Sequence, residues 1–190
     1  MIVRLSALIL MLLISSSALA AVPYYSLSAG AFFPGKTSTV DNSLRPVSVS
    51  YDAGWGVVGT IGAALDSGLR VENEVSYRQA LAKGSSEDMF VLLWTVNIWY
   101  DFFRQSAVSP YAGGGFGYGR GSVASPGLVD NSGSGVAWQA GGGISWRIDP
   151  KLLVDVGYRY FGIEDTSSGS GVGAFNPTGS SVMAGLRVGF

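Results

Sequence analysis

Hydrophobic residues recur at every second position along most of the chain beyond residue 21, which is the spacing of a β-strand with one apolar face. Residues 180–190 show this pattern clearly. The apolar positions there are Val182, Ala184, Leu186, Val188 and Phe190, and the alternate positions are Ser181, Met183, Gly185, Arg187 and Gly189. One face is therefore wholly apolar, while the other carries a full charge. Such a strand turns its apolar face either to lipid in a membrane barrel or to the core of a water-soluble sheet.

Seven earlier segments have the same strand character. They are residues 24–33, 55–65, 69–80, 89–102, 108–118, 136–147 and 152–161. A tilted strand needs ~9 to 11 residues to cross a bilayer, whereas strands in water-soluble domains average ~5 to 6. The lengths therefore favour a membrane barrel of eight strands.

The connections between these segments alternate strictly between long and short. The long connections are residues 34–54, 81–88, 119–135 and 162–179, and the short ones are 66–68, 103–107 and 148–151. A barrel with long loops outside the cell and short turns in the periplasm requires this alternation. The sequence therefore predicts an all-β fold, an eight-stranded antiparallel transmembrane barrel over residues 21–190.

Aromatic residues gather near the ends of the predicted strands, where two girdles at the membrane interfaces are expected. They are Tyr24, Tyr25, Phe33, Trp55, Tyr77, Tyr100, Phe102, Phe103, Tyr118, Trp138, Trp146, Tyr160 and Phe190. Aromatic side chains that simply fill a core are the alternative interpretation.

If the apolar faces look at lipid, the opposite faces bring charged side chains into the barrel interior. This predicted network contains Arg70, Glu72, Glu74, Arg78, Asp101, Arg147, Asp155, Arg159 and Arg187. An eight-stranded barrel is only wide enough for its side chains to fill, so buried charges of both signs are expected to pair. A structural ladder of ion pairs is the first interpretation, and a gated, narrow ion path is the second.

On the apolar faces, Asn73 interrupts the segment 69–80, and the interior assignment is least secure in the first half of 89–102, which is apolar on both sides.

Residues 1–20 have the three parts of a secretory signal peptide: Arg4 near the start, an apolar core, and an Ala-x-Ala site ending at Ala20. We therefore expect cleavage after Ala20. The apolar core is shorter than the ~20 residues that a membrane-spanning helix needs. The mature chain is predicted to lie in the cell outer membrane.

The composition excludes several classes of function. The chain has no Cys and no His, so thiolate and imidazole ligands, His-centred triads and the usual neutral-pH base are missing. The net charge of -1 gives no reason to expect nucleic acid as a partner. No cofactor and no metal site are predicted.

Two local patterns suggest chemistry but lack the required context. Glu72 and Glu74 lie on one strand face, as a glycosidase-like acid pair would, but Arg70 and Arg78 share that face and no cleft is implied. Residues 54–59 spell GxGxxG, but a polar loop precedes them and a strand follows, whereas a dinucleotide site requires a strand and then a helix. We expect no catalytic site.

The mature chain resembles the small eight-stranded outer-membrane barrels of the opacity-protein and surface-antigen type, which are similar in architecture to the OmpA transmembrane domain. The resemblance rests on residues 110–118 (PYAGGGFGY), 141–146 (GGGISW), 156–160 (VGYRY) and 184–190 (AGLRVGF). It implies an outer-membrane protein that the barrel-assembly machinery recognises through its final strand and Phe190. It implies less about activity, because members serve as adhesins, structural proteins, antigens or narrow pores.

The predicted function is that of a structural or surface-exposed envelope protein of the porin-like class, without enzymatic activity. Its outer loops, rich in Ser, Gly, Asn and Asp, are either simply solvated or contact host or envelope ligands. Three alternatives stay open: a genuine narrow ion channel, an enzyme that modifies outer-membrane lipid, and a soluble periplasmic binding barrel. The last would reverse the faces of every strand, exposing Arg70, Glu72 and Arg187.

Overall fold

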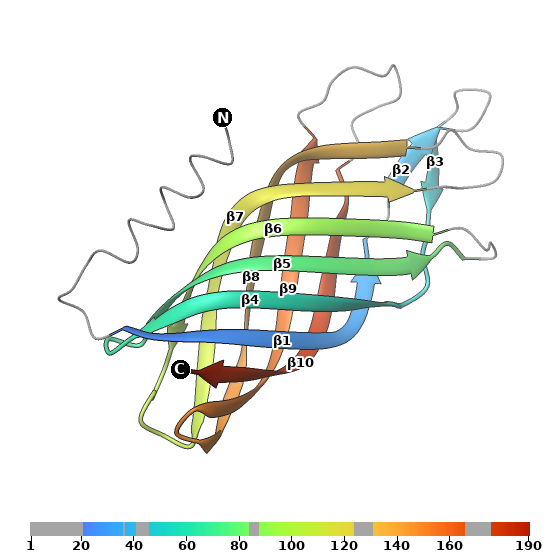
Figure 1. Ribbon diagram of the computed structural model, residues 1–190. Coiled ribbons are helices and arrows are strands. Elements are labelled where there is room, and N and C mark those ends of the chain that lie inside the picture. The colour runs from blue at the N-terminus through green and yellow to red at the C-terminus, as the bar shows by residue number, and fades with distance from the viewer. Residues whose placement is uncertain (1–20, 36, 41–45, 84–87, 124–130, 166–175) are drawn as a thin grey trace.

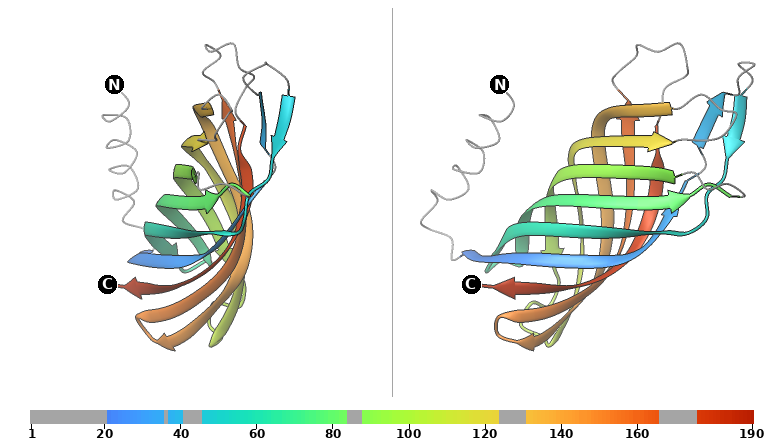
Figure 2. Two further views of the ribbon diagram at one scale, coloured as in Figure 1. Left: turned by 90° about the vertical axis from the view of Figure 1, so that its right-hand side faces the viewer. Right: turned by 45° about the vertical axis from the view of Figure 1, so that its right-hand side comes forward.

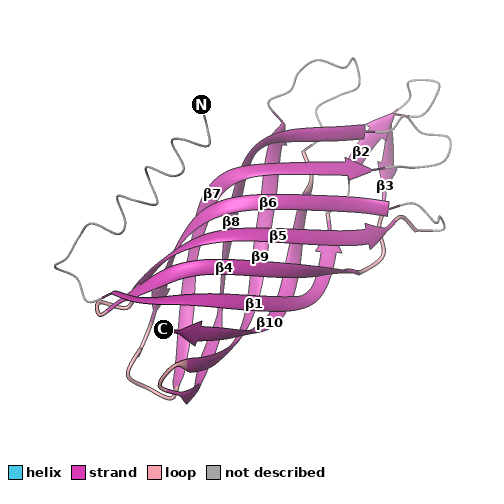
Figure 3. Ribbon diagram, viewed as in Figure 1, coloured by secondary structure: helices cyan, strands magenta, loops and turns pink. Residues whose placement is uncertain are grey.

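The computed structural model describes residues 21–35, 37–40, 46–83, 88–123, 131–165 and 176–190. The predicted signal peptide, residues 1–20, lies outside the described residues. Every regular element in the described part is a β-strand, as Figure 3 shows, and none of it forms a helix long and apolar enough to cross a membrane.

Eight of the strands close into one antiparallel barrel in the order β1-β10-β9-β8-β7-β6-β5-β4 (Figure 1). Their bounds are β1 Ala21–Pro34, β4 Gly54–Leu65, β5 Leu69–Leu81, β6 Asp88–Asp101, β7 Val108–Val123, β8 Asn131–Asp149, β9 Leu152–Asp165 and β10 Thr178–Gly189. All eight predicted strands are present, and the predicted fold class is confirmed.

The barrel closes where the first strand pairs with the last. The β1–β10 ladder runs from Tyr24 opposite Gly189 to Pro34 opposite Gly179, and β1 also pairs with β4 along its other edge. Figure 1 shows β1 and β10 side by side, so neither keeps an open edge. Just beyond β10, the Phe190 N–H donates to the Pro23 carbonyl at 3.0 Å. In a bilayer, which offers no water to unpaired backbone groups, this closure is obligatory.

Two of the long connections differ from the prediction. Residues 119–135 were predicted as a loop, but β7 and β8 continue as a paired ladder out to Val123 opposite Asn131. Glycine and serine dominate that stretch, so it lacks the hydrophobic alternation that would have marked it as strand. The connection from β1 to β4 contains a small hairpin of β2, Thr37–Val40, and β3, Pro46–Val49, which stands beyond the barrel wall in Figure 2.

The outer wall of the barrel is apolar over its whole circumference. Large exposed hydrophobic side chains occur on every barrel strand, and Leu27, Ile61 and Phe116 each expose about two thirds or more of their surface (67%, 66% and 73%). The charged residues Arg70, Glu72, Glu74, Arg78, Asp101 and Arg187 are buried inside the barrel instead, and Asp88, Arg120 and Glu164 are exposed near the long-loop ends of their strands. A soluble barrel would show the opposite arrangement, so that alternative is wrong.

Aromatic rings lie in bands at both ends of the apolar wall. At the short-turn end, the rings of Tyr25 and Phe190 lie 6.0 Å apart. At the long-loop end, Trp55 and Tyr77 lie 5.7 Å apart. This agrees with the two expected girdles. Tyr24 is the exception, because its ring is buried inside the barrel, where its hydroxyl donates to Glu72.

Glycines on the inner face of the wall make room for Tyr111. A Cβ added to Gly143 would lie 2.7 Å from Cζ of Tyr111, and Gly157 faces the hydroxyl of the same ring. Gly113, Gly115 and Gly117 face the β6 backbone, and the side chains of Trp99 and Asn97 also lie close to Gly113 and Gly115.

We expect Gly143→Ala to lower the free energy of unfolding by ~1 to 3 kcal/mol, because the new methyl group overlaps Tyr111 and the β9 backbone. The matched control is Gly59→Ala, since a Cβ there meets nothing within 4 Å. Urea titration of both variants in detergent micelles measures the difference. Equal stability of the two variants would show that Tyr111 does not need the space at Gly143.

Candidate functional site

The barrel interior is the candidate site, and β5 supplies half of its charged residues. Residues 70, 72, 74, 76 and 78 alternate with apolar residues along β5, so all five side chains point inward, and none is more than 4% exposed. Inward residues of β6, β8, β9 and β10 complete the cluster. The two-residue period of a strand thus determines which side chains of β5 lie in the interior.

Glu72 is the most heavily bonded carboxylate near the short-turn end. Its Oε1 lies 2.6 Å from Nη1 of Arg70 and accepts from the Tyr24 hydroxyl at 2.5 Å. Its other oxygen, Oε2, accepts from the Trp99 indole N–H at 2.9 Å. Arg70 in turn places its Nε 2.9 Å from Oδ2 of Asp101. Each of the three charged side chains in this group is therefore in an ion pair, which a buried charge requires.

Arg187, on the last strand, joins this group to the opposite wall. Its Nη2 lies 2.8 Å from Oδ1 of Asp155 and donates to Ser145 Oγ at 2.7 Å. Its Nη1 lies 3.6 Å from Oδ2 of Asp101. One guanidinium thus connects β10 with β9, β8 and β6.

Glu74 forms the centre of a second group, farther along the interior. It makes an ion pair with Arg159 and accepts hydrogen bonds from Asn97 Nδ2 and Gln139 Nε2, both at 3.1 Å. Four strands, β5, β6, β8 and β9, meet at this one carboxylate.

Arg78 lies beyond both groups, toward the long loops. Its Nε donates to Ser181 Oγ at 3.0 Å and its Nη1 to Ser76 Oγ at 2.8 Å. Its guanidinium lies 4.6 Å from the centre of the Phe161 ring, a favourable cation–π distance. Among the described residues no carboxylate lies within ion-pair distance of Arg78, so two serine hydroxyls and an aromatic face are its contacts, and its Nη2 is buried without a hydrogen-bond partner.

Arg147 does not join the interior groups, which corrects the prediction for that residue. Its Nη2 donates to the main-chain carbonyl of Arg104 in the β6–β7 turn. A register shift lies between Arg147 and Asp149, so strict alternation ends there and the side chain stays at the short-turn end. The structure places the other eight predicted charges inside the barrel, four cations and four anions.

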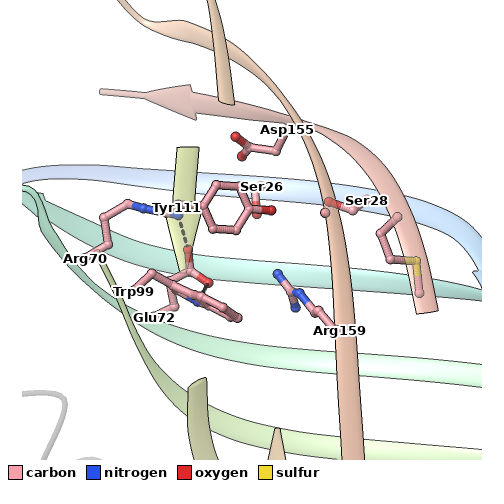
Figure 4. A pocket seen from close by; sticks show the side chains of 10 residues that line it. Ser26, Ser28, Arg70, Glu72, Trp99, Tyr111, Asp155 and Arg159 are labelled. Atoms are coloured by element: carbon pink, nitrogen blue, oxygen red, sulfur yellow. Dashed lines mark hydrogen bonds and ion pairs between the residues drawn. The ribbon is translucent and has the colours of Figure 1, made fainter. Parts of the chain in front are cut away.

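The acid pair suggested by Glu72 and Glu74 is not arranged for catalysis. Each carboxylate is engaged by its own arginine, and the cavity beside Glu72 holds only about 20 Å³, room for about one water molecule. Figure 4 shows Arg70, Tyr111 and Arg159 pointing into this cavity, with Asp155 at its edge.

Residues 54–59 lie within β4, paired on both sides, so no helix follows the GxGxxG pattern. Within the described ranges, no group of three or more acidic side chains could hold a metal ion.

An apolar layer fills the half of the interior nearest the long loops, and the sequence prediction missed it. Its buried residues are Phe32, Tyr51, Ala80, Ala82, Met89, Val91, Leu93, Ala137, Phe161 and Ile163. Five of the larger side chains, Phe32, Met89, Leu93, Phe161 and Ile163, are at most 1% exposed. The sequence feature that could have indicated this layer is the first half of β6, where both faces of the strand are apolar. One face meets lipid and the other meets this layer.

Comparison with known proteins places the chain in a family. A family model described as an outer membrane protein beta-barrel domain matches residues 6–187. The chain belongs to this family. It is therefore a protein of the outer membrane, with its short turns in the periplasm and its long connections outside the cell.

Solved structures share the architecture at low sequence identity. Neisserial surface protein A is 23% identical with a TM-score of 0.62, over 88% of this chain and 97% of that one. A major outer membrane protein from Thermus thermophilus is 16% identical with a TM-score of 0.51, over 90% and 100%. The outer membrane protease OmpT from Escherichia coli is 7% identical with a TM-score of 0.52, over 93% and 99%. These likenesses show the fold alone. No curated protein sequence matches the chain.

We expect Arg187→Ala to lower the free energy of unfolding by ~3 to 5 kcal/mol, because it removes the only cation within ion-pair distance of Asp155 among the described residues. Lys151→Ala is the matched control, since Lys151 is exposed in the β8–β9 turn. Equilibrium unfolding in micelles, followed by tryptophan fluorescence, gives both values. A result within ~0.5 kcal/mol of the control would mean that Arg187 does not hold the interior together.

Proposed function

We propose that this protein is a non-enzymatic, non-conducting barrel of the outer membrane that presents its outer connections to the surroundings of the cell. The interior is a structural plug, and contact with host or envelope ligands is made by the long connections.

The observation that carries this proposal is the apolar layer above the charged groups. An ion that entered from the periplasm would meet the paired charges first and then a layer of buried apolar side chains, with Arg78 at its boundary and the Tyr51 hydroxyl as a polar group within it. Moving a charge into such a layer is costly, because little there replaces its water. The narrow-channel alternative needs a continuous polar path, and the apolar layer interrupts it.

Support for the absence of catalysis comes from the side chains themselves. The buried acids are all bonded to arginines, and the chain has no His or Cys to act as base or nucleophile. OmpT is described as a protease, but its likeness to this chain at 7% identity concerns the fold only.

We further propose that the barrel-assembly machinery recognises the final strand. Phe190 follows β10 directly, and its ring is 64% exposed on the outer wall beside Tyr25. An exposed aromatic at this end of the strand that closes the barrel is accessible before β1 is paired.

Single-channel recording in a planar bilayer tests the proposed plug. We expect residues 21–190, refolded and checked for a heat-modifiable band, to be electrically silent. The variant Phe32→Ala/Phe161→Ala removes two rings that lie 5.9 Å apart in the apolar layer, and we expect it to admit water and show discrete openings. Phe33→Ala/Tyr160→Ala is the matched control, because both of those rings face outward. Selective, reproducible openings of the unaltered chain would contradict the proposal and favour the channel.

A further inference from the structure

Asn73 is a polar residue on the apolar outer wall. It follows the outward positions of β5, between Val71 and Val75, and its side chain contacts the outward-facing Trp94 of β6. The other outward neighbours across the strands are apolar, with Ile61 opposite on β4 and Val96 opposite on β6. Apart from the Trp94 indole N–H, the side chains that surround the amide group on this surface are hydrocarbon.

The depth of Asn73 is the middle of the membrane. Along β5, Leu69 lies opposite Tyr100 of the aromatic band at the short-turn end. Tyr77 belongs to the band at the long-loop end, where its ring stacks on that of Phe90 with the ring centres 6.4 Å apart. Asn73 is four residues from each. At about 3.3 Å per residue along a tilted strand, the interfaces and their polar lipid groups are out of reach of this side chain.

One part of the amide is satisfied and the other is not. The Trp94 indole N–H donates to Asn73 Oδ1 at 2.7 Å, which fixes the orientation of the amide. Among the described residues no acceptor is assigned to the Asn73 Nδ2 group, which carries two N–H donors. An amide donor without a partner in hydrocarbon costs several kcal/mol, so a partner at this depth would be strongly favoured.

We propose that the wall formed by β4, β5 and β6 is a lateral interface at which a second copy of this chain binds through Asn73. The two copies are related by a two-fold axis along the bilayer normal, so both Asn73 side chains lie at the same depth. Each Nδ2 then donates to Oδ1 of the partner's Asn73, which has a second lone pair free beside the Trp94 bond.

A second copy fits this position better than lipid does. Acyl chains supply no acceptor at the midplane, whereas an identical subunit brings a carbonyl oxygen to the required depth. The wall also permits close approach, because Gly59, opposite Val75, leaves open space where a side chain would stand. β4, β5 and β6 lie side by side in the barrel wall (Figure 1).

Disulfide cross-linking in lipid vesicles locates the interface. The chain contains no Cys, so single substitutions report one position at a time. Val75→Cys lies on the proposed interface, and Val156→Cys, similarly exposed on β9, lies on the opposite side of the barrel order. We expect a cross-linked dimer for Val75→Cys and little for Val156→Cys. Equal cross-linking at both positions, or none at either, would overturn the proposal.

Energy transfer between dye-labelled copies, carrying the label at Ser67→Cys in the β4–β5 turn, tests the role of the amide. We expect Asn73→Val to weaken association on the order of ten-fold, as the loss of two reciprocal hydrogen bonds in a membrane implies. Trp94→Phe keeps the amide and removes only its internal donor, so we expect it to preserve the dimer. Each variant is first checked for a heat-modifiable folded band.

The outcomes separate an interface from a purely internal role. If Asn73 serves only to accept from Trp94, Asn73→Val leaves association unchanged and the proposal fails. If the unaltered chain stays monomeric at every protein-to-lipid ratio, it also fails. Loss of energy transfer in Asn73→Val together with its retention in Trp94→Phe supports it.

Discussion

Closure of the backbone ladder is the constraint on which the rest of this structure depends. A strand in a bilayer has no water to satisfy an open edge, so β1 must pair with β10 as well as with β4. Eight strands are few, and the cylinder they enclose is too narrow for bulk water. Each inward side chain must then find its partners among the other inward side chains.

The interior meets this requirement in two different ways along its length. Toward the periplasm, ion pairs and hydrogen bonds satisfy the charges, with Glu72, Asp101, Asp155 and Glu74 each held by arginine. Toward the outside, Phe32, Phe161 and their neighbours fill the space with hydrocarbon, as in the core of a soluble domain. Arg78 stands at the boundary, with serine hydroxyls on one side and the ring of Phe161 on the other. The interior is thus polar toward the periplasm and apolar toward the outside of the cell, whereas the outer wall is largely apolar around the barrel.

Much of this arrangement could be predicted from the sequence, because a strand repeats every two residues and the membrane gives each face a different solvent. The alternation in residues 69–80 placed Arg70, Glu72, Glu74 and Arg78 on one face, and the structure has them inside. The apolar layer could not be predicted in the same way. Met89, Val91 and Leu93 are inward but apolar, so the pattern of β6 has no contrast from which to assign a face.

Other details depend on tertiary contacts that no local pattern contains. Tyr24 is an aromatic residue near a strand end, yet it lies on the inward face of β1, where its hydroxyl donates to Glu72, 48 positions away in the sequence. Arg147 fits the alternation, yet it is the last residue before a register shift, and its side chain donates to the Arg104 carbonyl at the end of the barrel. Tyr51 lies in a connection predicted to be polar, and it is buried in the apolar layer because it bridges to Ala82.

The most direct test of a filled, water-excluding interior is hydrogen exchange at the indole N–H of Trp99, followed by NMR in micelles. That residue is 1% exposed and its indole donates to Glu72 inside the barrel, whereas Trp146 is 58% exposed on the outer wall. A Trp99→Phe variant assigns the signal among the five tryptophans. We predict that the Trp99 proton persists long after the Trp146 proton has exchanged. Exchange at the same rate for both would mean that water passes freely through the interior, and the plug would not exist.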